Sequence, residues 1–187
     1  MRILFAASEV YPFSKTGGLA DVSGALPAAL TRLGHELLVI SPWYPSLDAR
    51  PYWIGDVEVP FDGRFETVGI GTLEKDGVSY AFVGNPLFSR DRLYGFDDDV
   101  RRFSLFTRAL PQVAERVGFR PQLAHVNDWH TAALPLVLNR GSHLPHGFAG
   151  LPSLLTVHNV QFQGEAGLDE VTWWLRLPGS SRDSWLN

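Results

Sequence analysis

The residues best suited to binding a charged substrate lie near the start of the chain, in the segment Lys15-Thr16-Gly17-Gly18. This segment follows an apolar run at residues 3–7, which predicts a short buried strand, and it precedes apolar residues spaced three and four apart, which predict a helix. Backbone N–H groups at a helix start favour an anion, and the Lys15 ammonium adds positive charge beside them. The segment therefore predicts a phosphate or carboxylate site, although a glycine pair also ends strands for purely conformational reasons.

Two further groups of polar residues, 128–130 and 158–159, follow apolar runs later in the chain. Asp128 can accept hydrogen bonds from sugar hydroxyls, or it can cap the next helix. Trp129 can stack on a sugar face or pack in the core, and His158 can orient a substrate or be a buried, hydrogen-bonded histidine. Asp21 lies in the first helical turn, where an acidic side chain is also favourable through the helix dipole alone.

The apolar pattern alternates between predicted strands and predicted helices. Strands are expected at residues 3–7, 36–40, 123–126 and 153–157, with helices at 19–33, 101–117 and from 129 or 131 to 139. This alternation predicts the α/β class, with a doubly wound, mostly parallel, Rossmann-like sheet. Residues 52–84 instead alternate apolar and polar residues around Lys75-Asp76-Gly77, which predicts a small antiparallel β-hairpin insertion.

The three polar segments share one position in this predicted fold, because each directly follows a strand. Ligands of doubly wound sheets bind beyond the carboxyl ends of the strands. We therefore expect residues 15–18, 128–130 and 158–164 to meet at one edge of the sheet and to form a single site.

Composition narrows the classes of function. The chain has 187 residues, a net charge of −4 and no cysteine, which disfavours nucleic acid and anionic membranes as partners and excludes thiolate chemistry and disulfides. We find no apolar run of membrane-spanning length and no secretory leader, so we expect a cytoplasmic protein.

Three sequence blocks resemble bacterial glycogen synthases and plant starch synthases of the ADP-glucose type. They are KTGGLADV at residues 15–22 (followed by GALP at 24–27), HVNDWHTA at 125–132 and TVHNVQFQG at 156–164. The resemblance implies one half of a two-domain GT-B glycosyltransferase. Residues 1–187 would form its single amino-terminal domain, and the carboxy-terminal sugar-nucleotide domain is absent from the sequence.

The resemblance also implies an activity and roles for residues. Such enzymes move glucose from ADP-glucose to the non-reducing end of an α-1,4-glucan such as glycogen, with retention of configuration and with no cofactor or metal. It implies catalytic roles for His158 and Asp128. The residues implied to bind substrate are Lys15, Gly17, Gly18, Asp21, Trp129 and Asn159. The missing domain would be the partner of this half, so the isolated chain is expected to be inactive.

Alternatives remain open at this stage. The chain can be a stand-alone glucan- or nucleotide-binding module, or His125, Asp128, His130 and His158 can form a metal site, although we expect His125 and His130 to be structural. A dinucleotide-dependent oxidoreductase is disfavoured because no G-x-G-x-x-G motif follows the first strand. Nucleotide preference, acceptor length, oligomeric state and the role of the tail at 165–187, with a helix expected at 168–175, are not specified by the sequence.

Overall fold

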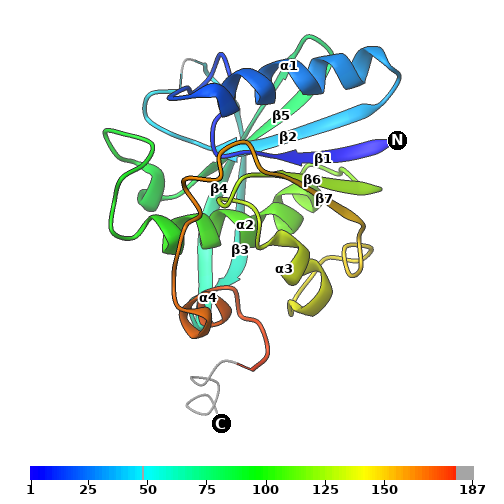
Figure 1. Cartoon of the computed structure of the whole chain (residues 1–187). Coiled ribbons are helices and arrows are strands. Elements are labelled where there is room, and N and C mark those ends of the chain that lie inside the picture. Colours follow the sequence, from blue (N-terminus) through cyan, green and yellow to red (C-terminus); the bar gives the residue numbers. More distant parts are fainter. Residues whose placement is uncertain (48, 180–187) are drawn as a thin grey trace.

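The computed structural model describes residues 1–47 and 49–179, and its centre is a seven-stranded sheet with the order β3-β4-β5-β2-β1-β6-β7 (Figure 1). The strands are β1 Arg2–Ala6, β2 Glu36–Pro42, β3 Tyr52–Phe61, β4 Arg64–Lys75, β5 Val78–Gly84, β6 Leu123–Asn127 and β7 Ser153–Thr156. Neighbours from β5 to β7 pair in parallel, which confirms the predicted doubly wound α/β class.

Helices cover both faces of the sheet, as Figure 1 shows for α1 (Gly18–Arg32) on one side and α2 (Asp99–Arg116) and α3 (Leu134–Arg140) on the other. Successive strand residues point to opposite faces, so each central strand must be apolar on both sides. In β1, Phe5 packs in the cluster that contains Leu19 of α1, whereas Leu4 packs in the cluster that contains Phe106 of α2. The continuous apolar runs in the sequence follow from this burial on both faces.

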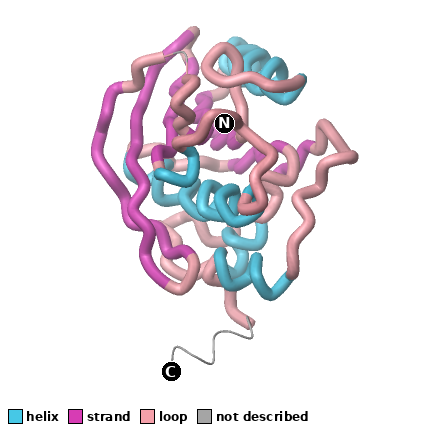
Figure 2. Tube along the Cα trace, turned by 90° about the vertical axis from the view of Figure 1, so that its left-hand side faces the viewer, coloured by secondary structure: helices cyan, strands magenta, loops and turns pink. Residues whose placement is uncertain are grey.

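The antiparallel segment extends the main sheet. The predicted hairpin at residues 75–78 is present, because Lys75 pairs with Val78 and the intervening Asp76 and Gly77 have φ angles of 52° and 74°. A second Asp-Gly turn, at Asp62 and Gly63, joins β3 to β4 and was not predicted. Both turns use left-handed backbone at two successive positions, which suits the twist of paired strands. Because β5 also pairs in parallel with β2, strands β3 to β5 belong to the main sheet and form one of its edges. These long strands run down one side of the molecule in Figure 2.

The structure corrects the start of one predicted helix. The helix expected to begin at residue 129 or 131 begins at Leu134, because residues 128–133 form consecutive turns that start with Asp128 at a φ of 57°. The predicted tail helix is α4, Leu168–Trp174, close to its expected bounds. The rest of the predicted tail, from residue 180, lies outside the described residues.

Helix α4 is anchored to the turn between β3 and β4. The indole Nε1–H of Trp173 donates to Asp62 Oδ1 at 2.9 Å, and the backbone N–H of Asp62 donates to the carbonyl of Trp174 at 3.1 Å. The guanidinium of Arg101 on α2 pairs with Asp62 Oδ2 at 2.6 Å. Asp62 therefore ties α2, α4 and the edge of the sheet together. Among the described helices, none is long and apolar enough to cross a membrane.

This anchoring predicts unequal costs for two glycine substitutions with the same backbone strain. Gly63 and Gly118 both have a φ of 75°, but a Cβ at Gly63 would lie 2.6 Å from Trp173 Cζ2, whereas one at Gly118 would meet nothing within 4 Å. Both alanine variants incur about 1–2 kcal/mol of left-handed strain. We expect Gly63→Ala to lose about 1–3 kcal/mol more in the free energy of unfolding, measured with urea, because the indole is displaced. Equal losses in the two variants would show that α4 is not held by this contact.

Candidate functional site

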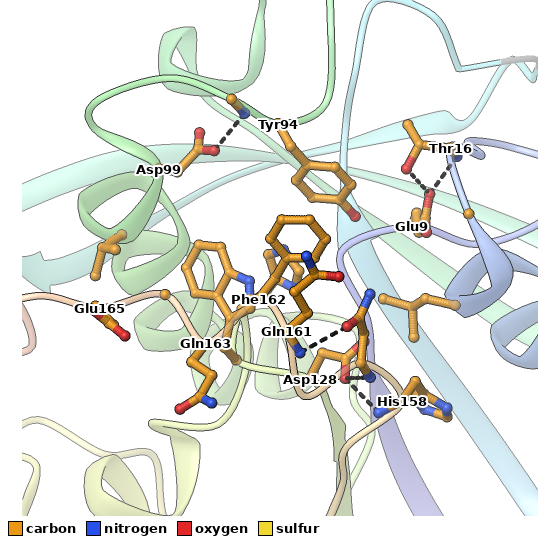
Figure 3. A pocket seen from close by; sticks show the side chains of 18 of the residues that line it. Glu9, Thr16, Tyr94, Asp99, Asp128, His158, Gln161, Phe162, Gln163 and Glu165 are labelled. Atoms are coloured by element: carbon orange, nitrogen blue, oxygen red, sulfur yellow. Dashed lines mark hydrogen bonds between the residues drawn. The ribbon is translucent and has the colours of Figure 1, made fainter.

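A cleft of about 910 Å³ lies beyond the carboxyl ends of β1, β6 and β7. Its lining comes from Glu9 and from residues 16–19, 94–97, 99–100, 128–130, 158–159 and 161–165. Figure 3 shows the side chains of most of these residues. All three sequence blocks that were expected to meet therefore do so around one hollow. The position agrees with the general rule for ligand sites in doubly wound sheets.

The glycine loop is held by a buried carboxylate that the sequence did not single out. Glu9 is only 3% exposed, and its Oε2 accepts hydrogen bonds from the Thr16 backbone N–H at 2.5 Å and from Thr16 Oγ1 at 2.8 Å (Figure 3). Gly17 is the residue before α1, and it has no side-chain cap. A Cβ at Gly17 would lie 3.6 Å from Glu9 Oε1, an ordinary van der Waals distance. Because no side chain caps this position, the first N–H groups of α1 are left for other partners.

The predicted substrate residues Lys15 and Asp21 pair with each other. Lys15 Nζ lies 2.5 Å from Asp21 Oδ1, and both side chains are about half exposed. Neither residue is part of the cleft lining, whereas their neighbours Gly17 and Gly18 are. An exposed pair of this kind contributes little to stability, so the ammonium can exchange Asp21 for another anion at small cost.

The carboxylate of Asp128 joins the ends of β6 and β7. Its Oδ1 accepts hydrogen bonds from the backbone N–H groups of His158 at 2.6 Å and Asn159 at 3.3 Å. The Asp128 side chain therefore does not cap the next helix, whose first flanking residue, Ala133, makes no side-chain cap. Asp128 is 6% exposed and has left-handed backbone, which aspartate tolerates better than most residues do. Its role is to fix the path of the loop that carries His158.

The imidazole of His158 is oriented by a second contact to β6. Its Nε2 lies 2.9 Å from Asn127 Oδ1, and Asn127 Nδ2 donates to the Ala6 carbonyl at 3.1 Å, which turns the amide oxygen toward the histidine. The Nε2–H of His158 therefore donates to Asn127, and Nδ1 is the remaining nitrogen for a ligand. The Asn127 contact was not predicted. The sequence feature that could have indicated this contact is an asparagine at the end of a buried strand, next to Asp128.

Trp129 and His130 form an aromatic wall. Their rings stack with centroids 4.1 Å apart, and the ring of Tyr94 lies 4.9 Å from His130. A Cβ at Gly164 would overlap the Trp129 indole, so the loop after His158 lies directly on this ring. Trp129 thus packs and lines the cleft at once. Burial, together with the nearby charge of Arg102, lowers the pKa of His130 to about 3, which keeps this imidazole neutral, as expected for a structural histidine.

The residues proposed for a metal site, His125, Asp128, His130 and His158, each have other contacts or surroundings in the structure. His125 is 7% exposed, as expected for a structural histidine, and its Nε2 lies 2.8 Å from Thr156 Oγ1. Burial lowers the pKa of His125, and the nearby His158 lowers it further. Within the described residues no three His, Asp or Glu side chains gather in a metal-binding group.

The charged residues that line the cleft are acidic. Its acidic lining residues are Glu9, Asp97, Asp99, Asp128 and Glu165. No Lys or Arg side chain is part of the lining in the described portion of the chain. Carboxylates can accept hydrogen bonds from hydroxyl groups, but they disfavour a nearby diphosphate. This cleft by itself is better suited to recognise a sugar than to hold a phosphate.

The contact between Asp128 and the His158 loop predicts a local effect of Asp128→Asn. Asparagine retains the tolerance for left-handed backbone but replaces two charge-assisted hydrogen bonds with neutral ones, at a cost of about 1 kcal/mol. We expect amide hydrogen exchange at residues 158 and 159 to accelerate about fivefold, measured by NMR. Asp97→Asn, which also changes a cleft carboxylate, serves as the control. Unchanged exchange in Asp128→Asn would show that another contact holds the loop.

Burial of neutral His130 predicts a pH dependence of stability. The folded-state pKa of about 3 lies below the ordinary value of 6.5, so the unfolded chain binds more protons between these values. This contribution to stability is complete above pH 6.5 and falls on acidification by up to about 1.4 kcal/mol per pH unit. We expect His130→Phe, which fits among the neighbouring rings, to flatten the pH dependence of the urea midpoint between pH 6.5 and 4. Parallel curves for both proteins would show that His130 titrates normally.

Comparisons with known proteins agree with this geometry. Residues 2–185 match the family model of the starch synthase catalytic domain. The chain is 41% identical over 190 residues to a glycogen synthase of Streptococcus sanguinis, covering 97% of this chain and 39% of that protein. It is also 40% identical to a glycogen synthase of Geobacillus thermodenitrificans, covering 88% of this chain and 35% of that protein.

A solved structure shares the fold. The catalytic domain of starch synthase IV from Arabidopsis thaliana, bound to ADP and acarbose, superposes with a TM-score of 0.82 at 32% identity, covering 94% of this chain and 37% of that one. This chain thus spans less than two-fifths of the length of these relatives. With the matching family model extending over nearly every residue, the chain belongs to the starch synthase catalytic domain family.

Proposed function

We propose that this chain is the amino-terminal half of a retaining glucosyltransferase that moves glucose from ADP-glucose to the non-reducing end of an α-1,4-glucan. The observation that carries the proposal is the convergence of residues 16–19, 128–130 and 158–165 on one cleft. These residues belong to the blocks by which the sequence resembles glycogen and starch synthases. ADP-glucose and glycogen are therefore the proposed substrates, and a cytoplasmic location follows from use of an activated sugar inside the cell.

The acidic lining of the cleft supports the proposal that a second domain supplies the cations for the reaction. Transfer from a nucleotide diphosphate builds negative charge on the departing phosphate, and this charge requires cationic or N–H donors. Among the described lining residues, Gly17 and Gly18 at the start of α1 offer backbone N–H donors, and Trp129, Asn159, Gln161 and Gln163 carry side-chain N–H groups, but none is a lysine or an arginine. Lys15 is close enough along the chain to contribute once it leaves Asp21. We propose that the other cations come from a carboxy-terminal domain, which is the partner of this half.

The described contacts support separate roles for the predicted catalytic pair. His158 lines the cleft, and its Nδ1 is the nitrogen not used by Asn127, so we assign it to contact the transferred glucose. Asp128 uses one carboxylate oxygen to hold the His158 loop, so we assign it to positioning. Asn159 and Trp129 line the same cleft and are proposed to bind substrate, as are Gly17 and Gly18 through their backbone.

The alternative of a stand-alone glucan- or nucleotide-binding module makes a different prediction. It requires useful affinity without a second domain, whereas a half-cleft that lacks lysine and arginine in its described lining should bind ADP-glucose weakly. The two functions are separated by assaying the chain alone and joined to the carboxy-terminal part of the Streptococcus sanguinis glycogen synthase.

We expect no glucose transfer from labelled ADP-glucose to glycogen by the chain alone, and measurable transfer by the joined protein. In the joined protein His158→Ala should lower kcat about 100-fold or more, since it removes a group that contacts the reacting sugar. His146→Ala changes an exposed histidine outside the cleft and should leave kcat unchanged. A folded joined protein that binds ADP-glucose but transfers no glucose would contradict the proposal.

A further inference from the structure

A second hollow, of about 490 Å³, opens on the same edge of the sheet as the cleft. It lies beyond the carboxyl ends of β2 and β5, where Trp43 and Tyr44 follow the first strand and Asn85 follows the second. Its remaining wall comes from β3 and β4, including Trp53 and Asp56. None of its lining residues is part of the cleft.

Two tryptophans form the apolar surface of this groove. The centroids of the Trp43 and Trp53 rings lie 6.4 Å apart, with an angle of 45° between their planes. Both rings lie against glycines of β4: a Cβ at Gly69 would be 2.5 Å from Trp53 Cη2, and one at Gly71 would overlap Trp43. Trp53 is nevertheless 52% exposed. The glycines therefore support the rings from below and leave indole surface open to a ligand.

Polar groups stand beside the exposed rings. The Asp56 carboxylate lines the groove, is exposed, and makes no hydrogen bond or ion pair with other described residues. Asn85 is 7% exposed and fixes the floor, since its Nδ2 donates to the Thr67 carbonyl at 3.0 Å and its Oδ1 accepts from the Leu87 N–H at 3.0 Å. A flat apolar face beside an unpaired acceptor matches a sugar ring, which has C–H faces and hydroxyl edges.

The groove is connected to the cleft through buried side chains. Tyr44, which lines the groove, donates its hydroxyl hydrogen to the Ser8 carbonyl at 2.9 Å. Ser8 Oγ in turn lies 2.7 Å from the hydroxyl of Tyr94, which lines the cleft. These contacts place the groove beside the cleft, and because β1 and β2 are neighbouring parallel strands, both hollows lie at the same end of the sheet, where an extended ligand can contact both.

We propose that the groove between Trp43 and Trp53 binds a distant part of the same α-1,4-glucan whose end enters the cleft. The choice of ligand rests on the function proposed above. Two indole platforms tilted by 45° suit a chain that curves from one sugar to the next, as α-1,4 linkage produces, better than the flat ribbon of a β-1,4-glucan. Asp56 accepts sugar hydroxyl hydrogens, and the open shape of the groove admits a polymer.

The test follows the indole N–H resonances of this chain by NMR during titration with maltoheptaose. Trp43 and Trp53 report on the groove, and Trp129 reports on the cleft. We expect the groove resonances to shift in a saturable manner with maltoheptaose and much less with the β-1,4-linked cellohexaose. Removing one apolar platform with Trp53→Ala should weaken the affinity seen at Trp43 about tenfold.

Two variants control for misfolding. Trp53→Phe retains an aromatic ring and should recover most of the affinity. Phe65→Ala removes an exposed ring on β4 that lies outside the groove, and it should have no effect. Groove resonances that stay fixed at high maltoheptaose, or that respond equally to cellohexaose, would overturn this proposal. If the joined protein transfers glucose but the Trp43 and Trp53 resonances do not shift, only the groove proposal is contradicted. If these resonances shift but the joined protein transfers no glucose, the groove is supported and the proposed function is contradicted.

Discussion

The candidate site depends on the hydrogen bonds from the His158 and Asn159 amides to the Asp128 carboxylate. Strands β6 and β7 are parallel neighbours, and their pairing ends at Asn127 and Thr156. One further backbone hydrogen bond follows this pair, from the Asp128 N–H to the Thr156 carbonyl at 2.9 Å. The amides of His158 and Asn159 lie past it and are satisfied by a side chain. Asp128 does so from a left-handed backbone conformation, which turns its carboxylate back toward β7. The loop that carries His158 thus takes its position from a side chain at the end of β6.

Glu9 repeats this arrangement at the next strand. It follows β1 and accepts hydrogen bonds from Thr16, as Asp128 follows β6 and accepts from the loop after β7. Both carboxylates are nearly buried and use backbone N–H groups as partners, and no lysine or arginine joins them in the described lining. Fixed N–H dipoles can stabilise a buried carboxylate without a counter-charge. The loops are ordered in this way, and the cleft remains negative.

The sequence was sufficient for features that depend on local pattern. Apolar runs located the central strands, Asp76-Gly77 located a hairpin, and the position of polar residues after strands predicted one shared edge. It was insufficient where a contact joins distant segments. The parallel pairing of β5 with β2 and the hydrogen bonds from Thr16 to Glu9 form only on folding, and no local pattern singles out Glu9. Likewise, Asp128 reads locally as a helix cap, because its partners lie 30 residues away.

The distribution of charge gives a physical reason for dividing the proposed reaction between two domains. A cleft with five acidic lining residues repels a diphosphate as long as it stands open, while its carboxylates attract the hydroxyl groups of a glucan. A cationic surface brought in by a second domain would both neutralise this cleft and clamp the nucleotide. The donor would then be held firmly only when the two halves close, after the acceptor has its own contacts. Closure would also exclude water, which would otherwise compete with the glucan for the activated glucose.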